Sequence, residues 1–223
     1  MSVVRPEYGP TLPELVGPRL ATVPRRTKIA VVALLALLVV AVAAVFLARR
    51  DPPTAVVVEE PVAFNLVYDE QALTRVVEPP EGAVFGLAER GDRAPQQLLV
   101  EPVTLPAYRG DPSAALLGLS SPAIEELRRE VGPTFLLRSE GRFRVNEATS
   151  GYQIAWQSRE EGEVTYGKRF LLVPDDYEEP PREALQVDLV VARNPANPNV
   201  DSVGVNGPLK RPLRSIRFGS ERP

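Results

Sequence analysis

Apolar side chains recur with a period of two along several short runs of the chain. The runs cover residues 152–156, 164–172 and 185–191, and further ones lie at 62–68, 96–105 and 143–145. Alternation of this kind is typical of strands that bury one face and expose the other. The polar stretch 158–163 joins two of the runs as a hairpin connection would. The pattern therefore predicts an antiparallel sheet with one solvent-facing side.

One segment between these runs follows the helical period instead. A Ser-Pro pair at 121–122 suits a helix start, apolar residues at 124, 127 and 131 share one face, and a Gly-Pro pair at 132–133 ends the pattern. A shorter helix is expected at 114–119, and a turn of helix at 208–215 leads into a last strand at 216–218. This order of elements predicts an α+β domain with helices packed on the antiparallel sheet.

A run of twenty residues, 29–48, contains no charged or strongly polar side chain. As a helix it would span about 30 Å, the thickness of the hydrocarbon core of a bilayer. The sequence therefore predicts one N-terminal transmembrane helix. A secretory signal peptide is the competing interpretation, because small residues such as Ala44 and Ala48 could precede a cleavage site. The run is, however, longer than the roughly 7–15 apolar residues of a signal peptide.

Charge is distributed unequally around this run. Four basic residues precede it within 19–28 and two follow it at 49–50, so we expect a cytoplasmic N-terminus and an extracytoplasmic C-terminal domain at the plasma membrane. The net charge of -3 divides into +5 for residues 1–50 (seven basic minus two acidic) and -8 for residues 51–223 (19 minus 27). The acidic outer part is a poor candidate for nucleic acid and should be weakly repelled by an anionic membrane surface.

Composition divides the chain into segments. They are a Pro-rich basic tail (1–28), the predicted transmembrane helix (29–48), a Pro-rich linker (49–61), the outer domain (62–218) and a short C-terminal tail (219–223). The outer domain is long enough to bury a single hydrophobic core.

The N-terminal tail carries the first candidate contact with a partner. Tyr8, Pro10, Leu12 and Pro13 combine apolar side chains with a Pro-x-x-Pro spacing. Such segments adopt the polyproline II conformation and can dock on aromatic grooves. The alternative interpretation is a solvated leader whose basic end only fixes the topology.

The residue types that are absent exclude several chemistries. The chain has no His and no Cys, so it cannot by itself form a Ser-His-Asp triad, a Cys nucleophile, a disulfide or a His or thiolate metal site. Carboxylates gather at 160–163 and 175–179 in expected turns. Solvated turns explain them better than a catalytic pair or a calcium site. We therefore expect no catalytic, cofactor-binding or metal-binding residue.

Two features of the predicted strands have both a functional and a structural interpretation. Lys168 lies in phase with the apolar face of its run and is better explained as a snorkelling side chain than as half of a Ser-Lys dyad. Tyr152 and Trp156 share one face, where packing in the core is favoured over an aromatic binding platform.

The longest polar loop, 194–207, carries the second candidate contact with a partner. Its polar residues include Asn194, Asn197, Asn199 and Asp201. Loops of this length are uncommon in compact domains unless they have a function. We therefore expect this loop to meet a protein partner in the cell envelope.

Three stretches carry a resemblance to a known family. They are GYQI at 151–154, KRFLLV at 168–173 and PLRSIRF at 212–218. Together with the order of elements over most of 62–218, they resemble the PsbP/Mog1-like group, which includes membrane-attached bacterial envelope proteins. The resemblance implies an α-β sandwich and a binding or assembly-assisting role. It implies no catalytic motif, so no functional residue follows from it.

These observations favour a single-pass membrane protein with an extracytoplasmic, non-enzymatic binding or scaffolding domain in the cell envelope. The expected partners are the lipid bilayer, through residues 29–48, and an envelope protein. Two alternatives remain open. One is a carboxylate-dependent envelope hydrolase, and the other is a membrane sensor that signals through residues 6–15.

Overall fold

The computed structural model describes residues 24–48, 53–91, 96–109, 112–175 and 182–222. The chain divides into two compact units, residues 1–51 and residues 52–223. In the first unit, helix α2 (Arg25–Ala48) contains the uncharged run, and its side chains at positions 29–41 are exposed. Within the described residues, no helix has the length and apolar character of a membrane span. The transmembrane prediction for 29–48 is therefore not confirmed.

The second unit is built on an antiparallel sheet of seven strands in the order β3-β4-β5-β9-β8-β7-β6. The strands are β3 (Leu73–Arg75), β4 (Phe85–Glu89), β5 (Gln96–Thr104), β6 (Leu136–Asn146), β7 (Thr149–Glu160), β8 (Glu163–Pro174) and β9 (Glu183–Ala192). The predicted hairpin joins β7 to β8 through Glu161 and Gly162, both with positive φ. Two such residues suit the twist of a tight hairpin, so this prediction is confirmed.

One face of the large sheet is covered by a smaller sheet and by the C-terminal segment. The smaller sheet has the order β1-β2-β10, with β1 (Thr54–Val58), β2 (Phe64–Tyr68) and β10 (Arg217–Phe218). Helix α4 (Lys210–Ser215) contacts β2 and β6, and the 3-10 turn η2 (Val200–Ser202) contacts β7 and β8. Leu209, Leu213 and Ile216 are almost fully buried in the core on this face. The predicted helical turn and last strand near the C-terminus are thus confirmed.

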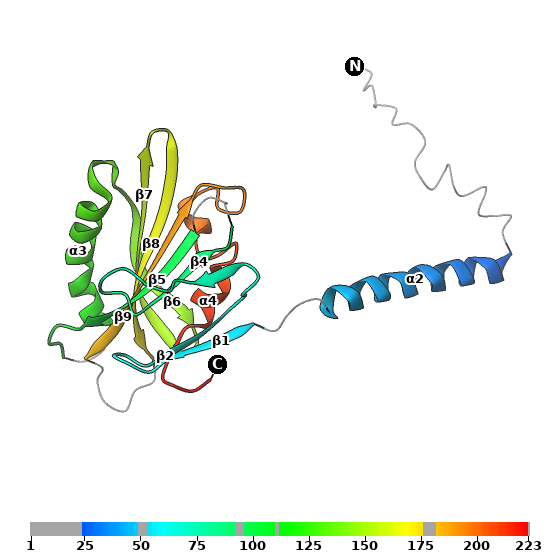
Figure 1. The fold of residues 1–223 in the computed structure, drawn as a ribbon, viewed down its shortest axis with the longest axis horizontal. Helices are drawn as coiled ribbons and strands as arrows, with labels where there is room; N and C mark the ends of the chain where they lie inside the picture. The colour runs from blue at the N-terminus through cyan, green and yellow to red at the C-terminus, as the bar shows by residue number, and fades with distance from the viewer. Residues whose placement is uncertain (1–23, 49–52, 92–95, 110–111, 176–181, 223) are drawn as a thin grey trace, which may run out of the picture. The chain divides into compact units, whose positions relative to one another are not determined.

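The other face of the large sheet is covered by helix α3 (Pro112–Val131). The 3-10 turn η1 (Gly132–Thr134) follows this helix in the chain. Figure 1 shows α3 along one side of the strands and α4 on the other. Tyr152 and Trp156 are buried in the core between α3 and the sheet, so they form no exposed aromatic platform. The structural interpretation of these two side chains is confirmed.

The structure differs from the sequence prediction in three local features. A single helix replaces the two expected at 114–119 and 121–131, so Ser121 is not a cap and Pro122 lies inside α3. Proline removes one backbone donor there, and packing of the apolar stripe offsets that loss. Strand β3, which has only three residues, and strand β4 were not predicted. Strand β1 lies within the expected linker, where its Val56 and Val58 pack against the core.

The prediction of a solvent-facing side of the sheet is wrong at the centre. The polar positions of β9, Gln186 and Asp188, face α3 rather than water, and Gln186 is only 5% exposed. Alternation in the sequence shows that one face of a strand is polar. It does not show whether that face meets water or a buried polar network.

Gly167 of β8 provides a test of this packing. A Cβ on Gly167 would lie 2.1 Å from Cε2 of Trp156, the residue opposite it on β7. The indole would have to leave its place under α3, so G167A should lower the free energy of unfolding by about 1–3 kcal/mol in urea denaturation followed by circular dichroism.

The matched control is G141A, because a Cβ on Gly141 of β6 meets nothing within 4 Å. We expect the stability of this variant to change by less than about 1 kcal/mol. Equal losses in the two variants would contradict the packing of Trp156 over Gly167.

Candidate functional site

Arg169 of β8 is buried beneath α3 and is surrounded by acidic side chains. Its guanidinium binds the Asp188 carboxylate of β9 through two hydrogen bonds, Nε to Oδ1 at 2.8 Å and Nη2 to Oδ2 at 2.9 Å. From α3, Glu130 accepts from Nη2 at 3.0 Å and Glu126 forms an ion pair with Nη1 at 3.3 Å. The Arg169 side chain is only 3% exposed, whereas those of Glu126 and Glu130 are about half exposed.

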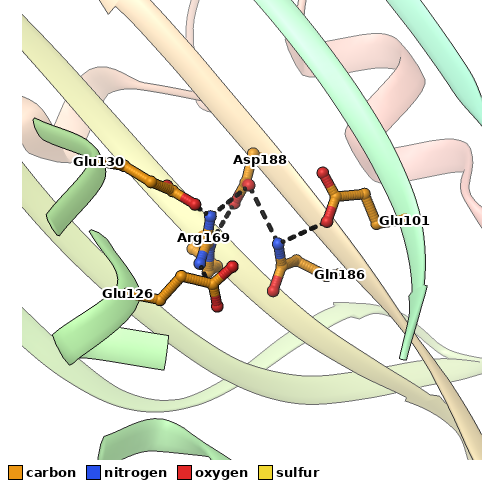
Figure 2. Close-up of polar contacts among 6 residues, drawn as sticks. All are labelled: Glu101, Glu126, Glu130, Arg169, Gln186 and Asp188. Atoms are coloured by element: carbon orange, nitrogen blue, oxygen red, sulfur yellow. Dashed lines mark hydrogen bonds and ion pairs between the residues drawn. The ribbon is translucent and has the colours of Figure 1, made fainter. Parts of the chain in front are cut away.

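The acidic cluster continues onto a third strand. Gln186 Nε2 donates to Asp188 Oδ2 and to Glu101 Oε2 of β5, each at 3.2 Å. Figure 2 shows Arg169 between Asp188 and the two glutamates of α3, and Gln186 between Asp188 and Glu101. We call these six residues the Arg169 network: Glu101, Glu126, Glu130, Arg169, Gln186 and Asp188. It joins three adjacent strands to α3.

Four carboxylates share one cation in this network, and burial raises the pKa values of three of them, Glu101, Glu130 and Asp188. Burial raises the pKa of Glu101, and Asp188 raises it further against the opposing effect of Arg169. Burial likewise raises the pKa of Glu130, which Arg169 opposes. Burial alone would lower the pKa of Arg169, but its bonds to Asp188 and the charges of Asp188, Glu130 and Glu126 together raise it, so the guanidinium stays charged.

The geometry of the Arg169 network is that of a brace. The guanidinium is held by three carboxylates, and Gln186 fixes the fourth acid. None of the six residues is among those that line the open hollow beside α4, described below. A buried charge must be paired to be tolerated, and here the pairing also sets where α3 lies on the sheet.

Sequence reasoning missed this network although its residues were visible. Arg169 shares a strand face with the buried Leu171 and Val173, and Asp188 shares one with the buried Ala184. A charge in phase with core positions on each of two strands was the available signal. Only the pairing of β8 with β9, which places Arg169 opposite Asp188, turns it into a contact.

The loop expected to meet a partner is packed onto the sheet. Asn194 Oδ1 accepts from the Asn197 backbone N–H at 2.8 Å, and Asn199 Oδ1 accepts from the Ser202 N–H at 3.1 Å. Asn197 is 1% exposed, whereas Asn199 and Asp201 are exposed. The side chains of Asn194, Asn197 and Asn199 therefore shape the loop itself. A partner contact at Asn199 or Asp201 stays a prediction.

Lys168 of β8 binds the backbone of the same loop. Its Nζ donates to the Asp201 carbonyl at 3.0 Å, and its side chain lies on the face opposite α3. Burial lowers the pKa of Lys168, and the nearby Arg214 lowers it further, against the effect of Asp201. Ser150, a serine of the neighbouring strand β7, donates to Asp175. Lys168 is thus a structural side chain in this fold.

An open hollow of about 450 Å³ lies beside α4 and is lined by Gly207, Lys210, Arg211, Arg214 and Ser215. Lys210, Arg211 and Arg214 are exposed. Among the described residues, the side chains of Lys210 and Arg211 have no ion-pair or hydrogen-bond partner. We call this surface the α4 hollow. It was missed by the sequence analysis, although the run of basic residues at 210–217 was its signal.

Two side chains hold the wall of the α4 hollow in place. Arg214 Nη1 donates to the Val145 carbonyl of β6 at 3.0 Å, and its guanidinium lies 5.4 Å from the centre of the Phe143 ring. Ser215 Oγ accepts from the Val67 N–H of β2 at 2.9 Å and donates to the Val67 carbonyl at 3.2 Å. The helix is thereby fixed on β2 and β6 while Lys210 and Arg211 project from it.

Other predicted features lie outside the described residues. They are the tail contacts Tyr8, Pro10, Leu12 and Pro13, and most of the acidic turn at 175–179. In the part of the chain that the structure describes, no group of three or more acidic side chains is arranged to hold a metal ion.

Comparison of the sequence with protein-family models and with curated proteins finds no match. Two solved structures are similar in fold. LpqN, involved in cell envelope biogenesis of Mycobacterium tuberculosis, has 13% sequence identity and a TM-score of 0.48, and the match covers 76% of this chain and 93% of LpqN. The Ran-binding protein Mog1p of Saccharomyces cerevisiae has 7% identity and a TM-score of 0.47, covering 74% of this chain and 95% of Mog1p.

Both structures are PsbP/Mog1-like folds, so the resemblance expected from the sequence is confirmed. At TM-scores below 0.5, neither match supports an argument about what this chain binds.

Replacing Arg169 tests whether the Arg169 network is a brace. R169M would leave Asp188, whose side chain is 16% exposed, without its cation. We expect the free energy of unfolding to fall by about 3–5 kcal/mol. The control is R128Q, which removes the exposed ion pair with Glu125 and the contact with the Phe135 ring and should cost less than about 1.5 kcal/mol. Similar losses in urea denaturation of the two variants would contradict the brace.

Replacing Glu101 tests the direction of its pKa shift. A carboxyl group with a raised pKa in the folded state binds its proton more tightly there, so its charged form destabilises the fold. E101Q should therefore be more stable than the wild type above the folded-state pKa. The difference should shrink as the pH falls towards the ordinary Glu value of about 4.3. Urea denaturation at several pH values measures it, and a gap that widens on acidification would contradict the shift.

Proposed function

We propose that this chain is a single-pass membrane protein whose α2 segment anchors an extracytoplasmic binding domain in the cell envelope. The uncharged run at 29–48 and the excess of basic residues before it support the anchor and its orientation. A folded domain follows this segment in the chain, and its first strand, β1, begins at Thr54.

The observation that carries the binding role is the α4 hollow. It is open, it is lined by three basic side chains, and two of these have no partner among the described residues. A folded domain whose open surface offers unpaired donors is suited to hold a ligand by charge and hydrogen bonds.

A non-enzymatic role agrees with the residues available. The chain lacks His and Cys, and the carboxylates that the Arg169 network gathers are bound to Arg169 or Gln186. A carboxylate-dependent hydrolase would need two acids facing a cleft. We therefore propose binding without catalysis.

Single cysteines test the anchor and its orientation, because the natural chain has none. We expect a membrane-impermeant maleimide to label S220C in intact cells and to label S2C only after the membrane is opened. The chain should also stay in the membrane pellet after alkaline carbonate extraction. Release into the supernatant, reversed labelling, or a mature chain that begins after residue 48 would each overturn the proposal.

A further inference from the structure

The C-terminal segment carries a net charge opposite in sign to that of the rest of the domain. Residues 51–201 sum to -12 (14 basic minus 26 acidic), whereas residues 202–223 sum to +4 (five minus one). Three of these five basic side chains line the α4 hollow. A domain that carries opposite charges on different parts of its surface is oriented by an external field. The net charge of -8 therefore does not describe how this surface meets an anionic partner.

The side chains of the α4 hollow suit a phosphate group. Arg211 and Arg214 offer planar guanidinium donors, and Lys210 offers a compact cation on a flexible stem. The Ser215 hydroxyl donates to the Val67 carbonyl, so it fixes the wall of the hollow and leaves the binding of phosphate to the basic side chains. The volume of about 450 Å³ exceeds what a lone phosphate needs and leaves room for the polar group attached to it.

The α4 hollow also lies close to where the chain enters the domain. Ser215 bonds to Val67 of β2, and Val67 is the antiparallel partner of Ala55 in β1. Ala55 is seven residues after Ala48, the last residue of α2. Six residue steps separate Ala48 from Thr54, and an extended chain covers at most roughly 20 Å over them. A membrane anchor in α2 would therefore keep this part of the domain near lipid head groups.

We propose that the α4 hollow binds the phosphate group of anionic lipid head groups in the membrane that holds the chain. This inference rests on the proposed anchor, which raises the local concentration of head groups around the domain. Lys210 and Arg211 contact the phosphate, and Arg214 and Ser215 form the fixed wall. Binding turns the basic segment towards the membrane and the acidic remainder of the domain away from it.

Native mass spectrometry of the full-length chain in a nonionic detergent tests this proposal. The probes are short-chain phosphatidylglycerol, phosphatidylcholine with the same acyl chains, glycerol phosphate and inorganic phosphate. We expect phosphatidylglycerol to bind more tightly than the other three. K210Q/R211Q should weaken its binding roughly 30-fold. Each basic residue near an anionic lipid surface strengthens binding roughly five- to sixfold, and this variant removes two of them. Both side chains are exposed, so the fold should be unaffected.

The matched control is R129Q/R138Q, which removes the same charge from exposed positions on α3 and β6. Its affinity for phosphatidylglycerol should stay within about twofold of the wild type. Equal weakening in both double variants, or equal binding of phosphatidylcholine, would overturn the site. An affinity for glycerol phosphate or inorganic phosphate equal to that for phosphatidylglycerol would assign the α4 hollow to a soluble anion and overturn the proposal of a lipid ligand. Failure of the anchor would appear in carbonate extraction and would leave this readout in detergent unchanged.

Discussion

Pairing of the buried Arg169 charge is the constraint on which the arrangement of this domain depends. A guanidinium that is 3% exposed requires several oxygen atoms around it, and in this fold β9 and α3 supply them. Its contacts with Glu126 and Glu130 therefore hold α3 over β7 and β8. Helix α3 thus covers part of one face of the sheet, and the α4 hollow lies beside the helix that packs on the opposite face.

The two sets of charges in the domain have different physical meanings. In the Arg169 network, pairing is obligatory because unpaired charges in a protein interior are costly. Lys210 and Arg211 are exposed to water, where neither needs a protein partner. Stability thus accounts for the first set and not for the second. The position of the second set beside a hollow, in the basic part of an acidic domain, is what connects it with binding.

Much of the fold could be predicted from the sequence because its strands alternate strongly. The β7–β8 hairpin, the α4 turn and the last strand were predicted from local patterns and turn residues. Strand β1 was not, because the prolines and acids around its valines indicated a linker. Pro122 divided α3 into two predicted helices, since the sequence does not show the tertiary contacts that compensate for a proline.

Neither the Arg169 network nor the α4 hollow could be assembled from the sequence alone. The first requires the register that brings Arg169 opposite Asp188, and the second requires β2 and β6 to hold α4. The most direct test of this division between brace and binding surface is the double variant R169M/D188L. Replacing a buried ion pair by apolar residues is often neutral for stability. We predict a folded protein whose phosphatidylglycerol affinity stays within about twofold of the wild type. A folded double variant that no longer binds phosphatidylglycerol would contradict the account.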